Sequence, residues 1–132
     1  MQASVNVKNS LAIGLGGVVG SLFRYLISLI IIAEGFPFAT LCVNLMGCFI
    51  LSYILHNDKV KKILSPPMFA SLSVGLIGSF TTFSTFSVET IELWNKSQLL
   101  AVLYCIISVL GGLFFCFLGF KSSLTGRKRG NV

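Results

Sequence analysis

Four long apolar runs constrain the fold of this chain more than any other feature. They cover about Leu11–Ala33, Phe38–His56, Met68–Trp94 and Leu99–Phe120. Each is close to the ~20 residues that a helix needs to cross ~30 Å of hydrocarbon. Of the 132 residues, 55% are hydrophobic and 11% are charged, and so short a chain cannot bury that much apolar side chain in a water-soluble core. The sequence therefore predicts an all-α membrane protein in which residues 1–132 form a single domain of four transmembrane helices.

Basic residues gather on one side of the predicted helices. Because the connections are short, the N-terminus, the connection Asn57–Pro67 and the C-terminus share a side. That side carries Lys8, Lys59, Lys61, Lys62, Lys121, Arg127, Lys128 and Arg129, whereas the other side carries Lys96. The positive-inside rule predicts that both termini are cytoplasmic. The net charge of +6 then reflects contact with anionic lipid headgroups, and we expect no nucleic-acid binding.

The third run contains a polar, glycine-broken stretch that a helix facing lipid does not need. Gly75 and Gly78 lower helix propensity, and five hydroxyl side chains that compete for backbone groups follow: Thr81, Thr82, Ser84, Thr85 and Ser87. We expect the helix to unwind near Gly78–Thr81, beside a cavity rather than lipid. Carbonyls freed there would suit a small hard cation. Phe83 and Phe86 share a helix face, and the positive edges of their rings can interact with an anion.

The other runs carry fewer polar residues. Each of these residues has both a structural and a functional interpretation. Arg24 lies mid-way along the first run, where a charge is costly. It either ties helix ends together or attracts an anion from an aqueous vestibule. Asn44 can bond an anion or a neighbouring helix. Tyr104 and Ser108 begin a row of residues four apart that suits close packing, or a pore lined by hydroxyls.

Two further sequence features have a structural reading. Gly16 and Gly20 form a GxxxG face that lets another helix approach closely. The cysteines lie inside the runs without metal-ligand spacing, and we expect them to be small packing residues: Cys42, Cys48, Cys105 and Cys116. Neither a hydrolytic nor a redox constellation is recognisable, so an enzyme is not expected.

Three ordered motifs give the chain a resemblance to a known family. The first run has Gly-Gly-Val-Val-Gly-Ser-Leu-Phe-Arg-Tyr at 16–25. The second has Thr-Leu-Cys-Val-Asn-Leu-Met-Gly-Cys-Phe at 40–49, and the third has Thr-Thr-Phe-Ser-Thr-Phe at 81–86. In order, spacing and chain length, these motifs resemble the Fluc (CrcB) family of fluoride-specific ion channels of bacterial plasma membranes.

This resemblance implies an antiparallel dimer with two fluoride pores at the subunit boundaries, which export fluoride passively. Phe83 and Phe86 match the phenylalanines whose ring edges line the pores, and Asn44 matches an asparagine that donates to fluoride. The polar track of the family corresponds to Thr82, Ser84, Thr85, Tyr104 and Ser108. The carbonyls of Gly78 and Thr81 match those that hold a structural sodium ion, which is not transported. Arg24 matches a structural or vestibular arginine.

The bias in Lys and Arg leaves the composition of the dimer open. A homodimer needs the same chain inserted in both orientations, whereas eight basic residues against one predict a single orientation. We therefore hypothesise pairing with an oppositely oriented homologue. Two alternatives to a channel that conducts alone are a small multidrug-type exporter, which should have an acidic residue in the first run, and a non-conducting partner subunit of a heterodimeric channel.

Overall fold

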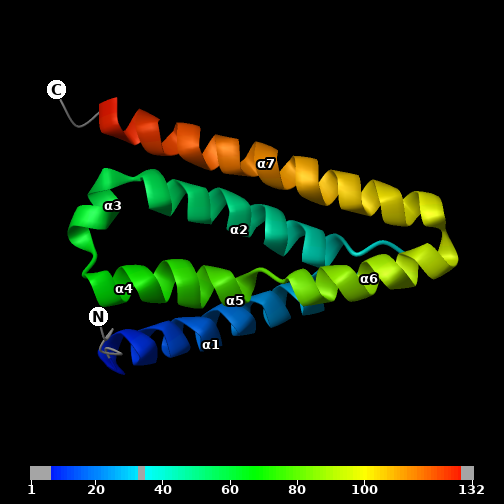
Figure 1. The fold of residues 1–132 in the computed structure, drawn as a ribbon, viewed down its shortest axis with the longest axis horizontal. Coiled ribbons are helices and arrows are strands. Elements are labelled where there is room, and N and C mark those ends of the chain that lie inside the picture. Colours follow the sequence, from blue (N-terminus) through cyan, green and yellow to red (C-terminus); the bar gives the residue numbers. More distant parts are fainter. Residues whose placement is uncertain (1–6, 33–34, 129–132) are drawn as a thin grey trace, which may run out of the picture.

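The computed structural model describes residues 7–32 and 35–128, and its helices pack side by side as a membrane bundle (Figure 1). The elements are α1 (Val7–Ile30), α2 (Phe38–His56), α3 (Asp58–Ile63), α4 (Pro66–Ala70), η1 (Ser71–Ile77), α5 (Gly78–Phe80), α6 (Phe83–Lys96) and α7 (Gln98–Lys128). Within the described residues, four helical stretches are long and apolar enough to cross a membrane: Val7–Ile30, Phe38–His56, Pro66–Lys96 and Gln98–Thr125. The predicted four-helix architecture is confirmed. The predicted end of the first run at Ala33, the residue Glu34 and Arg129 lie outside the described residues.

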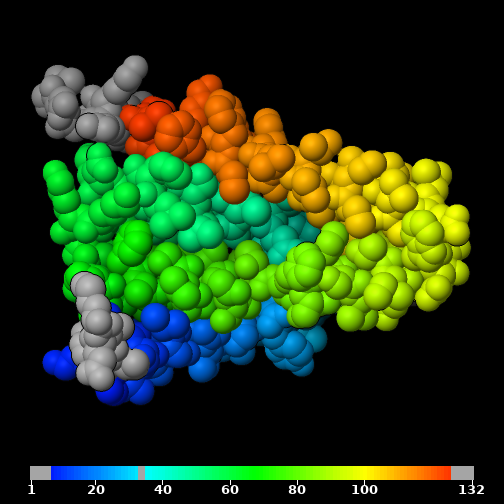
Figure 2. Space-filling view, viewed as in Figure 1, coloured from blue at the N-terminus to red at the C-terminus, as the bar shows by residue number. Residues whose placement is uncertain are grey.

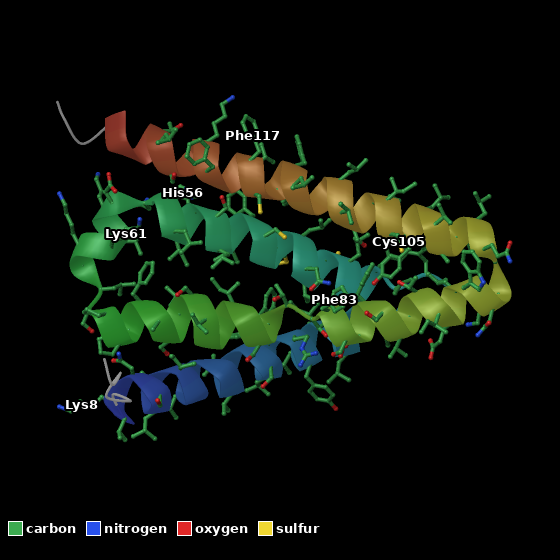
Figure 3. The ribbon with its side chains drawn as sticks, in the orientation of Figure 1. Lys8, His56, Lys61, Phe83, Cys105 and Phe117 are labelled. Carbon is green, nitrogen blue, oxygen red and sulfur yellow. The ribbon has the colours of Figure 1, made fainter. Side chains whose placement is uncertain are left out.

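The four stretches run up and down, so that both described ends of the chain lie at the same end of the bundle as α3 (Figure 1). The turn between α6 and α7 lies at the opposite end. Lys8 and Lys61 accordingly project from the same end (Figure 3). The grouping of basic residues that the sequence predicts is therefore a feature of the fold.

The third stretch changes its neighbours along its length. Its first half, η1 and α5, packs mainly against α1, whereas α6 packs against α7. The helices α2 and α7 make the most extensive contact in the bundle. In the space-filling view α1 lies along the outside of the third stretch (Figure 2). The junction between α5 and α6 is thus the point at which the chain passes from one packing environment to another.

Glycines allow α1 and η1 to pack with their backbones in contact. A Cβ atom at Gly20 would overlap the carbonyl oxygen of Leu76, and one at Gly16 would overlap that of Ser71. In the opposite direction, a Cβ at Gly75 would overlap the carbonyl oxygen of Ile13. The predicted GxxxG face is therefore a real helix–helix contact, and it extends to a glycine of the third stretch.

Three local features differ from the sequence-based expectation. The connection expected at Asn57–Pro67 contains the short helix α3, whose start is capped because Asn57 Oδ1 accepts from the amides of Lys59 and Val60 at 3.0 and 3.2 Å. The segment η1 is a π-helix, a wider turn that a propensity argument does not foresee. Finally, α7 continues to Lys128, eight residues past the predicted end of the fourth run at Phe120.

The buried core of the described residues is small. One cluster of buried residues joins Leu41 of α2, Leu93 of α6, and Ala101 and Tyr104 of α7. Large apolar side chains elsewhere remain exposed, among them Leu15 at 69% and Leu113 at 65%. Such a surface suits lipid or another protein subunit rather than water.

Candidate functional site

The candidate site is built around a break in the third stretch. The helix α5 ends at Phe80, and Thr81 (φ −80°, ψ 158°) and Thr82 (φ −147°, ψ 123°) are extended before α6 begins at Phe83. The break predicted in this run is confirmed, but it lies at Thr81–Thr82, because Gly78 is still helical at φ −62° and ψ −31°. The hydroxyl-bearing residues, rather than the glycine, mark the unwound backbone.

The carboxamide of Asn44 holds this break in place. Asn44 Nδ2 donates to the carbonyl oxygen of Thr82 at 3.0 Å, and Asn44 Oδ1 accepts from the amide of Thr82 at 2.8 Å. Both backbone groups of an extended residue are therefore paired with one side chain of α2, as buried backbone groups require. The Asn44 NH₂ group has a second hydrogen, which these two bonds do not use.

The break also changes the hydrogen bonding of two carbonyl groups. In a continuous helix the Gly78 carbonyl would accept from the Thr82 amide, but that amide donates to Asn44. The Thr81 carbonyl would likewise accept from the amide of Thr85, which donates to Thr82 Oγ1 at 3.1 Å instead. The carbonyls that the family resemblance matches to a cation are thus among those that the break leaves without their helical donors.

Thr82 caps α6 and brings its hydroxyl neighbours together. Besides accepting from the Thr85 amide, its hydroxyl donates to Thr85 Oγ1 at 2.9 Å and lies 3.3 Å from Ser84 Oγ. Thr82 is buried, Thr85 is half-buried and Ser84 is exposed. Three of the predicted polar residues therefore form one hydroxyl cluster at the start of α6.

The aromatic residues form a row from the surface into the core. The rings of Phe83 and Phe86 have centroids 5.9 Å apart, and those of Phe86 and Tyr104 are 5.0 Å apart. Phe83 is 79% exposed, whereas Tyr104 is fully buried. Figure 3 shows Phe83 at the break. The row therefore begins at an exposed ring beside the break and ends in the buried core.

Glu89 holds a position that sequence reasoning did not resolve. Thr40 Oγ1 donates to Glu89 Oε1 at 2.7 Å, and the Tyr104 hydroxyl donates to Glu89 Oε2 at 2.8 Å. One carboxylate therefore joins α2, α6 and α7. The signal available in the sequence was an acidic residue in an apolar run close to an expected pore, together with polar residues on two other runs.

One cavity gathers most of the remaining candidates. It has a volume of about 390 Å³ and is lined by Asn44, Thr82, Phe83, Phe86 and Ser108, among others. The Ser108 hydroxyl is buried and has no hydrogen-bond partner. This hydroxyl is therefore available to donate a hydrogen bond into the cavity.

Arg24 also lies near Thr82, but it does not line the 390 Å³ cavity. It lines two further cavities, of about 270 and 520 Å³, and Ser21 and Thr82 line both with it. Its Nε atom is buried without a partner. Arg24 therefore lies beside protein and hollow space.

Comparison with known proteins identifies the family. The family described as "CrcB-like protein, Camphor Resistance (CrcB)" matches residues 11–120, which includes all four runs and every residue of the site. The chain belongs to the CrcB family. Its match takes in the Asn44 contact, the break and the aromatic row together.

Several relatives of this CrcB chain have been named for a function. The chain is 45% identical over 112 residues to "Fluoride-specific ion channel FluC 1" of Bacillus cereus, which covers 82% of each chain. It is 45% identical over 106 residues to a protein of that name from Desulfitobacterium hafniense, covering 79% of this chain and 93% of the relative. It is 40% identical over 121 residues to "Fluoride-specific ion channel FluC 2" of Listeria innocua, covering 91% of this chain and 94% of the relative.

Proposed function

We propose that this CrcB chain is a subunit of a fluoride-selective channel that exports fluoride passively from the bacterial cytoplasm across the plasma membrane. The observation that carries the proposal is the shared cavity of Asn44, Phe83, Phe86 and Ser108 at the break. The names of its relatives support the same ion. A channel of this kind needs no catalytic group, so the protein is proposed not to be an enzyme.

The chemistry of the cavity suits a small, strongly hydrated anion. Fluoride leaves water only where donors replace its hydration shell, and the second Asn44 hydrogen and the unpaired Ser108 hydroxyl are such donors. The ring edges of Phe83 and Phe86 add weak positive potential without binding water. Weak contacts in series allow the ion to leave as well as to enter.

The proposed assembly is an antiparallel dimer, with this chain paired either with itself or with an oppositely oriented homologue. The exposed Phe83 ring and the unpaired Ser108 hydroxyl support a site that is completed by a second subunit. The basic residues at one end of the bundle support cytoplasmic termini and the heterodimer. In a heterodimer this chain need not form a conducting pore by itself.

The diverted hydrogen bonds around the break fit the proposed structural sodium ion. Carbonyl oxygens are suitable ligands for a hard cation, and the helical donors of the Gly78 and Thr81 carbonyls bond elsewhere. Gly78 is also exposed, with open space where a Cβ would lie. A sodium ion held by these carbonyls and by their equivalents in a second subunit would fix the two breaks against each other.

The alternative hypothesis of a small multidrug-type exporter is not supported by the environment of Glu89. A proton-coupling carboxylate must be free to bind substrate, whereas both oxygens of Glu89 accept bonds within the fold. The non-conducting partner subunit remains the second candidate, because the charge bias favours a single orientation.

The test is fluoride efflux from liposomes that contain the purified protein, read with a fluoride electrode, with chloride efflux as the control. Rapid release of fluoride alone would establish a homodimeric channel. We expect Phe83→Ile to suppress this efflux while leaving the dimer intact on gel filtration. If the chain alone is silent, co-reconstitution with an oppositely oriented homologue should restore efflux. Silence of both preparations would contradict the channel.

A further inference from the structure

We propose that Cys48 of α2 and Cys116 of α7 form a two-thiol site for a soft, thiophilic metal ion of the class of Ag(I), Cu(I) and Hg(II). The sequence alone treats these cysteines as packing residues on separate helices. The structure brings them together at the most extensive helix contact of the bundle. Neither residue is among the proposed fluoride ligands, although both line the same cavity.

The two cysteines are neighbours across the contact between α2 and α7. The Cys116 thiol donates to the carbonyl oxygen of Cys48 at 3.6 Å, and both residues line one cavity. Both cysteines are half-buried and free. The other two cysteines, Cys42 and Cys105, make no such contact with each other and provide an internal control.

The surrounding contacts fix the register of the two helices. The Ser52 hydroxyl donates to the carbonyl oxygen of Cys116 at 2.7 Å. One turn further along α7, Gly119 lies so close to α2 that a Cβ there would overlap the carbonyl oxygen of Phe49. One turn before Cys116, a Cβ at Gly112 would lie 3.5 Å from Cys48 Sγ, so the glycine leaves space beside the sulfur. The two sulfurs are therefore held near each other by the fold.

This donor set selects the class of metal. Thiolates prefer soft ions, and two metal–sulfur bonds of about 2.3 Å in a line would place the sulfurs about 4.6 Å apart. Within the described residues there is no group of three or more His, Cys, Asp or Glu side chains that could hold a metal. A tetrahedral zinc site is therefore excluded for that part of the chain, whereas a two-coordinate ion needs the two thiols alone.

The charge also balances inside the membrane, where an uncompensated ion is costly. Binding of Hg²⁺ forms two Hg–S bonds and breaks two S–H bonds, so that two protons leave and the site stays neutral. Ag⁺ or Cu⁺ displaces one proton and is held by one thiolate and one thiol, which is again neutral. Binding of each ion therefore releases as many protons as the ion has charges.

The site opens into the cavity that contains the proposed pore residues. Cys48 and Cys116 line the 390 Å³ cavity together with Asn44, Phe83 and Phe86. A metal ion between the sulfurs would occupy part of this space and should block fluoride. This consequence depends on the proposed channel function, whereas metal binding itself does not.

The binding test uses the full-length protein in detergent, reduced and then freed of reductant, with one equivalent of HgCl₂. In the variant Cys42→Ser/Cys105→Ser, native mass spectrometry should find one mercury per chain, with two protons lost and no chloride retained. Adding Cys48→Ser or Cys116→Ser should instead give an adduct that retains chloride and has lost one proton. Adducts of this second kind in the variant with both thiols present would overturn the site.

The functional arm uses the same variants in liposomes. One equivalent of HgCl₂ should abolish most fluoride efflux when both thiols are present. The variant that also carries both Cys48→Ser and Cys116→Ser has no thiol in the cavity and should keep the rate that it had before mercury. A bridged mercury without loss of efflux would show that the pore lies elsewhere and would refute the block. Absence of efflux before mercury would count against the channel alone, and the mass measurement would still decide the site.

Discussion

The carboxamide of Asn44 satisfies both backbone groups of Thr82 and so stabilises the one extended segment of the third stretch. These two bonds leave one N–H of the Asn44 carboxamide available to an ion. Asn44 can therefore hold the break and bind an anion at the same time. A single residue thus maintains the break and also faces the cavity that the break opens.

Asn44→Ala should therefore affect stability and transport together. The substitution leaves the amide and the carbonyl of Thr82 without their partners, at a cost of about 1–3 kcal/mol for each buried group. We expect a lower midpoint of thermal unfolding in detergent and a slower fluoride efflux. Ser21→Ala is the control, because the Ser21 hydroxyl bonds within its own helix, to the Val18 carbonyl at 2.9 Å. An unchanged midpoint for Asn44→Ala would contradict the role of Asn44 in the break.

Glu89 allows a graded test at the same scale. Glu89→Gln keeps one carboxamide oxygen as an acceptor but replaces the other with an NH₂ group, so either Thr40 or Tyr104 loses its acceptor. We expect Glu89→Gln and Tyr104→Phe each to lower the unfolding midpoint, since Tyr104→Phe leaves Glu89 Oε2 without its donor. Differential scanning fluorimetry of the detergent-solubilised protein measures both. Equal midpoints for wild type and Glu89→Gln would mean that this carboxylate does not join the three helices.

At the scale of elements, the contact between α1 and η1 depends on the absence of side chains. Gly20→Ala would place a methyl group on the carbonyl of Leu76, which is backbone and cannot rotate away. We expect a loss of about 1–3 kcal/mol, as for other overpacked contacts, measured as a lower unfolding midpoint. Gly14→Ala is a matched control on the same helix, since its Cβ would meet nothing within 4 Å. Similar losses for the two variants would contradict the proposed contact.

The elements themselves followed from hydrophobic length, because a bilayer demands ~20 apolar residues for each helix. Hydroxyls and glycines in the third run were enough to predict a break. The predicted position, near Gly78–Thr81, was close to the observed break at Thr81–Thr82. The exact residues were not predictable, because Thr82 is held by Asn44, 38 positions away in the sequence. The contact between Cys48 and Cys116 depends in the same way on how α2 and α7 are aligned. So do the two hydrogen bonds that Glu89 accepts from Thr40 and Tyr104. The π-helix η1 has no local signal that we can name.

At the scale of the whole molecule, the buried core is too small to account for the apolar composition. The chain has 55% hydrophobic residues, yet side chains such as Leu15, Phe83 and Leu113 remain more than half exposed. The lipid bilayer covers part of this surface. A second subunit would cover the part around the break, where an exposed aromatic ring and an unpaired buried hydroxyl occur together.

The orientation of the molecule decides which second subunit is available. Basic residues at one end of the bundle should hold every copy with its termini in the cytoplasm, because moving them across the membrane opposes the positive-inside rule. Expressed alone with a C-terminal reporter, the chain should give signal on the cytoplasmic side only. Replacing Lys59, Lys61 and Lys62 with Gln should weaken this bias and produce both orientations, whereas Lys96→Gln should leave it unchanged. Signal on both sides from the unaltered chain would remove the reason for a heterodimer and leave the antiparallel homodimer as the assembly.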